Sequence, residues 1–232
     1  MIEVISLKIK TIWHGSTEII EKPVYGFGKP NNDYGIGFYC TESEELAKEW
    51  ACQIPGMNGY ANAYQIDISD LNILFLSSPE YTILNWLALL VKNRDFRSST
   101  AVSRQGKEYL LNHFLPDISA YDIIVGYRAD DSYFSFARAF VNNEISLEQL
   151  SYAMKLGKLG EQFVLKSEKA FSALHFLKYD IANSAQYYSK RKKRNLDATA
   201  AFRKEQEIDD LNGLYMREII RERIDNSDAR IR

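Results

Sequence analysis

A segment rich in glycine and proline, residues 22–37, separates two short stretches of strand-forming sequence near the start of the chain. Residues 8–13 before it alternate between polar and apolar side chains, and residues 38–40 after it read Phe-Tyr-Cys. The segment cannot extend either strand, because proline has no amide hydrogen to donate and glycine weakens regular structure. A connection of this length without its own secondary structure is typical of a functional loop.

The rest of the body alternates between short helices and short strands. The hydrophobic periodicity predicts helices over residues 42–53, 82–92, 133–141 and 146–156 and from Ser167, strands over residues 62–68, 73–76, 121–127 and 162–166, and a helix or loop over residues 93–108. Two of the helices begin with predicted capping boxes, from Thr41 to Glu44 and from Ser146 to Gln149. Short strands interleaved with helices and long loops favour an α+β fold over regular βαβ repeats.

The C-terminal part differs from the body in charge. Residues 190–232 carry 12 Lys and Arg against 9 Asp and Glu, whereas residues 1–189 carry 17 against 22. We interpret the basic run at residues 190–194 as a solvated linker, with contact to phosphate or to an acidic partner as the alternative. We therefore predict a domain over residues 1–188, followed by a basic linker and a C-terminal helix over residues 189–232.

The predicted C-terminal helix covers residues 195–223, which are strongly helix-favouring. Its apolar side chains fall roughly on one stripe: Ala198, Phe202, Ile208, Leu211, Tyr215 and Ile219. We expect this helix to lie against the body, with a helix that binds a partner or a second copy as the alternative.

The composition is that of an ordinary soluble globular protein. Hydrophobic residues make up 46% of the 232 residues and charged residues 26%, which excludes disordered, collagenous and membrane classes. The longest apolar run, residues 83–91, falls short of the roughly 18 residues of a membrane span. The first residues do not read as a signal peptide, and only Cys40 and Cys52 are present. We therefore expect a cytoplasmic protein with no disulfide framework and no membrane partner.

Several common catalytic motifs are absent from the sequence. The three histidines and two cysteines have no metal-ligand spacing, so we expect no metal site. The stretch Gly28-Lys29-Pro30 is not a phosphate-binding loop, and residues 35–37 lead into aromatic residues rather than a dinucleotide-binding glycine motif. No Gly-x-Ser-x-Gly motif occurs either. Machinery for phosphoryl transfer or serine hydrolysis is therefore not visible.

Three polar or aromatic residues instead stand at the ends of predicted strands. His14 lies in Trp13-His14-Gly15-Ser16, Tyr39 ends Gly35-Ile36-Gly37-Phe38-Tyr39, and Gln162 begins a strand after Glu161. Each of them alone has a structural explanation, as a core histidine, a packed aromatic and a strand-edge residue. In this order they resemble the His-Tyr-Glu pattern of the ADP-ribosyltransferase superfamily, on the branch shared by diphtheria-toxin-like and poly(ADP-ribose)-polymerase-like domains.

The resemblance covers residues 8 to about 178 and is most specific in its first two motifs. Within the superfamily the chain looks similar to a group of small bacterial members that share the stretch Tyr-Asp-Ile-Ile-Val-Gly-Tyr-Arg-Ala-Asp-Asp at residues 121–131. The resemblance implies a split antiparallel β-sheet core of ADP-ribosyltransferase type, surrounding helices and a C-terminal helical tail. It also implies a cleft that takes NAD+ as co-substrate.

The resemblance assigns a role to each residue of the two motifs. His14 would form a hydrogen bond with the adenosine ribose, and the Gly15 backbone, with Ser16, would hydrogen-bond the nicotinamide carboxamide. Tyr39 would stack on the nicotinamide ring, with Tyr34 as a second stacking face, and Gly37 would let the backbone come close to the dinucleotide. Gln162 would lie at the nicotinamide ribose. Flat aromatic surfaces suit the stacking role.

Gln162 departs from the family pattern, in which this position is a glutamate. An amide can donate and accept hydrogen bonds, but it cannot ionise, so it cannot serve as a general base. Glu161 would face the opposite side of a strand and is no automatic substitute. Asp130 and Asp131 are the next carboxylates to consider, and a capping role at the helix near Tyr133 is their structural alternative.

These features lead to a functional hypothesis with two alternatives. We expect an NAD+-dependent mono-ADP-ribosyltransferase that modifies a protein or nucleic-acid acceptor, with a role as a toxin or defence effector paired with a small antitoxin. The first alternative is a catalytically inactive module that binds NAD+ or ADP-ribose, which the amide at Gln162 favours. The second is an interaction adaptor that uses the basic run and the C-terminal helix. The acidic balance of the body predicts a dinucleotide site that works by shape and stacking rather than by charge.

Overall fold

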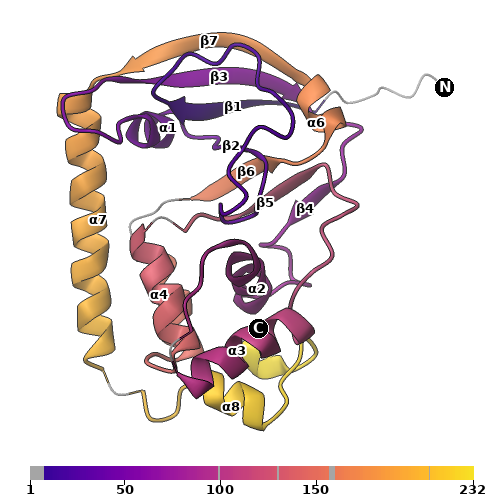
Figure 1. The fold of residues 1–232 in the computed structure, drawn as a ribbon, viewed down its shortest axis with the longest axis vertical. Coiled ribbons are helices and arrows are strands. Elements are labelled where there is room, and N and C mark those ends of the chain that lie inside the picture. Colours follow the sequence, from indigo (N-terminus) through magenta and orange to yellow (C-terminus); the bar gives the residue numbers. More distant parts are fainter. Residues whose placement is uncertain (1–7, 99, 130, 157–159, 209) are drawn as a thin grey trace.

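The protein is described by a computed structural model over residues 8–98, 100–129, 131–156, 160–208 and 210–232. Figure 1 shows two β-sheets with helices packed around them. The strands are β1 (Ile9–Ser16), β2 (Phe38–Cys40), β3 (Gly59–Asp67), β4 (Ile73–Phe75), β5 (Ile123–Tyr127), β6 (Glu161–Leu165) and β7 (Leu174–Ala182). The helices are α1 (Glu44–Ala51), α2 (Ile83–Asn93), α3 (Ala101–His113), α4 (Asp131–Val141), α5 (Leu147–Ala153), α6 (Glu168–Ser172), α7 (Ser184–Gln206) and α8 (Met216–Arg221). The predicted α+β class is confirmed.

The strands divide between the sheets in the orders β1-β3-β7 and β2-β6-β5-β4. The first sheet is antiparallel throughout, whereas β4 and β5 in the second sheet pair in parallel. The expectation of a purely antiparallel core is therefore wrong at this one pair. The reason lies in the connection, because the chain crosses from β4 to β5 through α2 and α3, and such a long crossover allows parallel pairing.

The two sheets meet where β1 passes β2. Trp13 and Thr41 form an isolated bridge in which each backbone N–H donates to the other residue's carbonyl, at 2.7 and 2.9 Å. The bridge also moves the start of the next helix, because the backbone of Thr41 is used in strand pairing. Ser43 rather than Thr41 is the N-cap of α1, and its hydroxyl accepts the Leu46 N–H at 3.3 Å. The predicted Thr41–Glu44 capping box is therefore not formed.

The second sheet is covered on both faces. Ile123, Val125 and Phe163 pack against Ile12 and Tyr64 of the first sheet. The neighbouring strand residues Ile124 and Val164 face the opposite way and belong to a larger core that they form with the helices below the second sheet. The architecture is thus three layers, consisting of sheet, sheet and helices.

The C-terminal part differs from the prediction in three respects. The basic run at residues 190–194 lies inside α7 instead of a linker, and the strand β7 before it was not expected. The predicted helix over residues 195–223 is interrupted between α7 and α8, so its stripe is split. Ile208 and Leu211 lie in the interruption and are 57% and 84% exposed. Helix α7 runs along one side of the molecule, from the end of β7 to the helices at the opposite end (Figure 1).

Other elements follow the sequence closely. The Ser146–Gln149 capping box is present at the start of α5, and Thr82 caps α2. Cys40 and Cys52 are both buried free thiols. Within the described residues, no helix has the length and apolar character needed to cross a membrane.

Candidate functional site

A cavity of about 680 Å³ opens where β1, β2 and β6 come together. Six of the residues singled out in the sequence line it: His14, Gly15, Ser16, Gly37, Tyr39 and Gln162. The loop between β1 and β2 supplies much of the remaining wall, with Asn32 and Asp33 among its polar members. The volume lies within the range of about 300 to 1,000 Å³ typical of small-molecule sites.

His14 is tied directly to Tyr39. Its ring nitrogen Nδ1 lies 2.7 Å from the Tyr39 carbonyl oxygen, and its ring stacks on Phe38 with centroids 4.4 Å apart. Because a carbonyl can only accept, Nδ1 carries the proton and Nε2 is left as the acceptor of the neutral ring. Burial lowers the pKa of His14, although the bond to the Tyr39 carbonyl opposes the shift. The site therefore holds a neutral histidine with one acceptor nitrogen.

Gly15 and Ser16 each have a local structural role as well as a place on the cavity wall. A Cβ atom on Gly15 would lie 2.1 Å from the Ala47 carbonyl oxygen, so glycine is what lets α1 pack against β1. The Ser16 hydroxyl accepts the Glu18 N–H at 3.1 Å and turns the chain out of β1.

Tyr39 is clamped by the loop that precedes it. Its hydroxyl donates to the Gly35 carbonyl at 2.6 Å and accepts the Tyr34 N–H at 3.0 Å. Gly35 has a φ of 73°, a left-handed conformation that suits glycine. A Cβ on Gly37 would lie 2.8 Å from Val164 Cγ1, so this glycine lets the loop approach β6. The phenol is thereby fixed while the ring remains on the cavity wall.

Tyr34 does not provide a second stacking face. Its side chain is 1% exposed and belongs to the core, and its hydroxyl donates to the Tyr127 carbonyl at 2.7 Å. The space for it comes from Gly126, where a Cβ would lie 2.5 Å from the Tyr34 hydroxyl oxygen. The expected stacking role of Tyr34 is therefore wrong, because its ring is buried against β5 and does not line the cavity.

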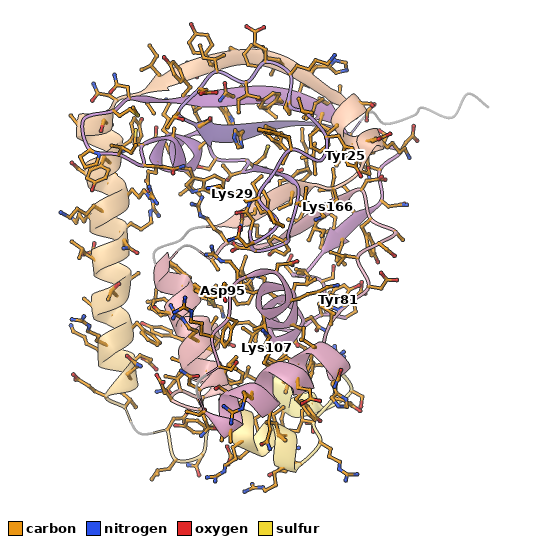
Figure 2. All side chains as sticks on the ribbon, in the orientation of Figure 1. Tyr25, Lys29, Tyr81, Asp95, Lys107 and Lys166 are labelled. Atoms are coloured by element: carbon orange, nitrogen blue, oxygen red, sulfur yellow. The ribbon has the colours of Figure 1, made fainter. Side chains whose placement is uncertain are left out.

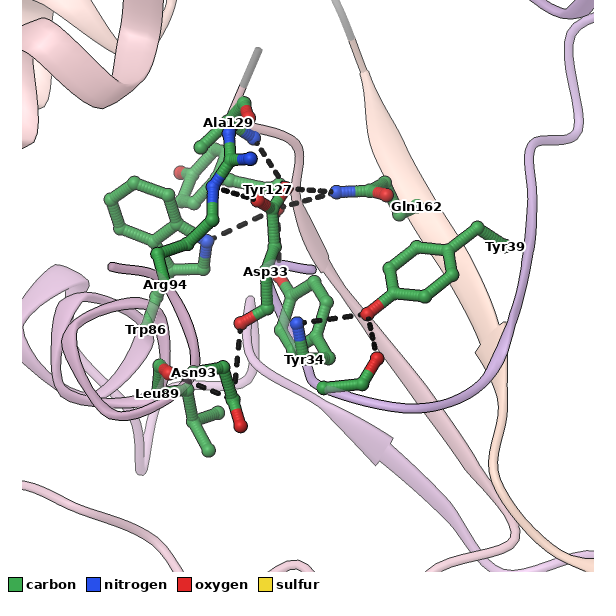
Figure 3. A network of polar contacts seen from close by, with 11 residues as sticks. Asp33, Tyr34, Tyr39, Trp86, Leu89, Asn93, Arg94, Tyr127, Ala129 and Gln162 are labelled. Atoms are coloured by element: carbon green, nitrogen blue, oxygen red, sulfur yellow. Dashed lines mark hydrogen bonds and ion pairs between the residues drawn. The ribbon is translucent and has the colours of Figure 1, made fainter. Parts of the chain in front are cut away.

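Gln162 lines the cavity and has a neighbour that the sequence did not indicate. Its side chain is 4% exposed, and Nε2 donates to Asp33 Oδ2 at 2.7 Å (Figure 3). Glu161 is exposed and lines a smaller cavity of about 360 Å³ with Lys10 and Glu42. Gln162 borders this smaller cavity as well, but neighbouring residues of a strand point to opposite faces, and Glu161 is exposed where Gln162 is buried.

Asp33 is the buried carboxylate of the site, at 6% exposure. It pairs with Arg94, whose Nε lies 3.1 Å from Oδ1, and it accepts the Ala129 N–H at 2.8 Å through Oδ2. Burial raises the pKa of Asp33, and the nearby positive charge of Arg94 opposes this shift. Arg94 in turn donates to the Ala129 carbonyl at 2.7 Å. Asp33, Arg94, Ala129 and Gln162 thus form one polar cluster on the cavity wall.

The cavity wall is more cationic than the composition of the body indicates. Four cationic side chains line it, namely Lys29, Arg94, Arg128 and Arg191, against Asp33 as its carboxylate. Lys29 lies in the loop before β2 and is labelled in Figure 2. The Arg128 guanidinium stacks over the Trp50 ring at 3.8 Å from its centroid. The expectation of a site that works without charge is therefore wrong, since charge averaged over the chain does not describe this wall.

Sequence reasoning missed Asp33, Arg94 and Arg128. Arg128 was part of the stretch at residues 121–131 that carries the resemblance, so a signal for it existed. Asp33 carried no signal except that it is an acidic residue in a glycine-rich loop. Arg94 follows the end of a predicted helix and belongs to no recognisable motif. Asp130 lies outside the described residues, as does the side chain of Asp131, so their proposed roles stay predictions. Among the described residues, no group of three or more potential metal ligands gathers.

The fold and the site define an α+β protein with a cationic cavity at the junction of two sheets. The chain belongs to the family described as "Protein of unknown function (DUF3990)", whose model matches residues 10–176. The matched region runs from β1 to the first residues of β7 and so includes both motifs and Gln162. Neither the curated proteins nor the solved structures include a match to the chain.

Proposed function

We propose that this protein is an NAD+-dependent mono-ADP-ribosyltransferase that modifies a protein or nucleic-acid acceptor. The observation that carries the proposal is the contact between His14 and Tyr39 at 2.7 Å on the wall of one cavity that Gln162 also lines. Residues that lie 25 and 123 positions apart in sequence thus come together in the order of the His-Tyr-Glu pattern.

The reaction breaks the bond between the nicotinamide nitrogen and C1 of its ribose. The bonding electron pair leaves with nicotinamide, and the nucleophile of the acceptor forms the new bond to C1 and loses a proton. Positive charge develops on the ribose in the transition state. The site must therefore orient the substrate and stabilise this charge. Neutral His14 accepts a hydrogen bond from a ribose hydroxyl, and the Tyr39 ring offers a flat face on which nicotinamide stacks.

The cationic wall supports a dinucleotide as the substrate. A diphosphate carries negative charge that Lys29, Arg128 and Arg191 are placed to offset at the cavity edge. Gln162 cannot take a proton from the acceptor, so a single transfer to an acceptor that is already nucleophilic fits this site better than chain elongation.

The proposal extends to the biological setting through the family resemblance. We place the protein in the cytoplasm as a toxin or defence effector, where a small antitoxin is the expected partner at the C-terminal helix. Within the basic run, Lys192 and Lys193 are exposed and could contact such a partner, whereas Arg194 and Lys190 contact α1.

The test is incubation of the purified protein with labelled NAD+ and lysate, followed by measurement of nicotinamide release and of label in protein, RNA and DNA. His14→Ala and Tyr39→Ala should each lower nicotinamide release at least about tenfold, because each removes a substrate contact. Matched controls are His175→Ala on the exposed surface of β7 and Tyr25→Ala, which lies in the same loop and is 49% exposed (Figure 2). Wild-type turnover in the first two variants would contradict the site assignment.

A binding module without activity is the second candidate. It is favoured by the amide at Gln162 and by the ion pair of Asp33 with Arg94, because both leave the site without a free carboxylate. Under this candidate, NAD+ or ADP-ribose binds in calorimetry, Tyr39→Ala abolishes the binding, and neither label transfer nor nicotinamide release occurs.

A further inference from the structure

The orientation of the Gln162 amide is set by its neighbours. Its Nε2 lies 2.7 Å from Asp33 Oδ2 and 3.5 Å from the Tyr127 carbonyl oxygen. An ionised carboxylate and a carbonyl both only accept hydrogen bonds, so the NH₂ group must face them and Oε1 must point away. Figure 3 shows the amide nitrogen turned toward Asp33 and Tyr127 and the oxygen turned to the side of Tyr39.

Asp33 is itself held as a fixed acceptor. The Arg94 guanidinium lies at 3.1 Å from Oδ1, and the Ala129 N–H donates to Oδ2 at 2.8 Å. Asn93 anchors the same loop by donating its side-chain NH₂ to the Asp33 carbonyl at 3.3 Å. If this carboxylate turned toward another partner, the Ala129 N–H would lose its acceptor and the Arg94 guanidinium would lose its counter-charge.

We propose that Asp33 is a positioning residue that turns the Gln162 side-chain oxygen toward the cavity, where it accepts a hydrogen bond from a hydroxyl of a ribose-containing ligand. This inference rests on the proposed function and names a residue through which that site works. An amide oxygen held in this way offers the acceptor that a carboxylate would offer, without adding a second negative charge next to Asp33.

The pair also explains why a glutamate at position 162 does not fit this chain. Two carboxylates at hydrogen-bond distance cannot both ionise, so one of them keeps a proton and the apparent pKa of the pair rises. The charged and titratable groups that act on Asp33 are Arg94, Arg128, Tyr34 and Tyr39.

The experiment measures the binding of NAD+ and of two analogues, each lacking the 2′-hydroxyl of one ribose, by calorimetry between about pH 4 and pH 8. For the wild type, one analogue should bind about tenfold more weakly than NAD+, because Oε1 loses its donor. Asp33→Ala and Gln162→Ala should bind NAD+ and that analogue equally. Glu161→Gln changes a carboxylate to an amide on the opposite face of β6 and should behave as the wild type.

Gln162→Glu provides a test that does not depend on removing Asp33. Its affinity for NAD+ should fall as the pH rises through the apparent pKa of the carboxylate pair, because the second ionisation drives the two side chains apart. The wild type should show the opposite trend, with affinity falling as the pH drops and Asp33 takes up a proton. Burial raises the pKa of Asp33, so this loss begins above the ordinary range of an aspartate.

The outcomes separate the inference from the proposed function. If the wild type binds no NAD+, both are overturned. If the wild type binds NAD+ but Asp33→Ala still discriminates against the analogue, or Gln162→Glu shows the pH trend of the wild type, only the positioning role is overturned. If Asp33→Ala does not fold, the pH profile of Gln162→Glu alone decides.

Discussion

Gly15 is the point at which α1 comes closest to β1. Its missing side chain lets the backbone of Ala47 approach, and the neighbouring Trp50 closes over the same spot. The residue that would touch a ligand through its backbone is therefore also the residue that sets the position of a helix. A substitution here changes packing and cavity shape together.

Gly15→Ala should lower the free energy of unfolding by about 3 kcal/mol, because the new methyl group would meet backbone atoms that cannot turn aside. Thermal unfolding followed by circular dichroism measures the effect. The matched control is Ile9→Ala in the same strand, where the side chain is 48% exposed and its removal should cost less than about 1 kcal/mol. Equal melting temperatures for Gly15→Ala and the wild type would show that α1 can move away freely.

The key site residues differ in how far sequence could locate them. His14 and Tyr39 were predictable because each lies in a recognisable local motif. Asp33 was not, because a carboxylate in a polar loop gives no sign that it will be buried beside an arginine 61 positions later. Tyr34 shows the reverse problem, since its burial depends on Gly126 of a distant strand. Local patterns identify residue types, but long-range packing decides which of them reach the cavity.

At the scale of elements, α7 is attached to α1 through charged side chains. Arg194 forms two hydrogen bonds with the carboxylate of Glu49, at 2.9 and 2.7 Å, and the Glu49 side chain is only 5% exposed. Lys190 pairs with Glu45 at 2.8 Å, where both side chains are about half exposed to solvent. One contact is therefore largely buried and the other lies at the surface.

Arg194→Ala should lower the free energy of unfolding by about 2 kcal/mol, because it leaves a buried carboxylate without its partner. Lys190→Ala, as the matched control on the same helix, should cost less than about 1 kcal/mol, since exposed pairs contribute little. Urea unfolding, measured for both variants at low and at high salt, distinguishes the buried ion pair from the exposed one. If both variants unfold at the wild-type urea concentration, α7 is not held to the body by this pair.

The elements were predicted best where a local signal marks their ends. The predicted cap at Ser146 located the start of α5, and the apolar run of residues 83–91 located α2, whose start Thr82 caps in the structure. Thr41 misled because a long-range bridge to Trp13 used the residue that looked like a cap. Strand β7 was missed because most of its side chains are exposed, so the sequence lacks the apolar alternation of a half-buried strand.

For the molecule as a whole, the C-terminal part shares the main core. Seven of its side chains are buried there: Ala198, Phe202, Leu214, Met216, Ile219, Ile224 and Ile231. The Phe202 ring contacts Phe136 of α4 with centroids 4.0 Å apart. The family model ends at residue 176, so the matched region depends on packing from sequence beyond it.

A chain that ends at residue 189 should therefore lose cooperative unfolding, because removal of these side chains opens the helical layer to water. Limited proteolysis and thermal unfolding of the truncated and full chains measure this. The alternative expectation, that the tail is a docking arm, requires a truncated chain with the same melting temperature and NAD+ binding as the full chain.

The two cysteines add a consequence for the chemistry of the intact molecule. Cys40 and Cys52 are fully enclosed, and burial raises the pKa of both thiols. Alkylating reagents and oxidants attack the thiolate, so they can act on these sulfur atoms only when the protein opens. Cys40 directly follows Tyr39, and its sulfur therefore reports openings of β2. The rate of thiol modification in native buffer thus measures how often the two sheets separate.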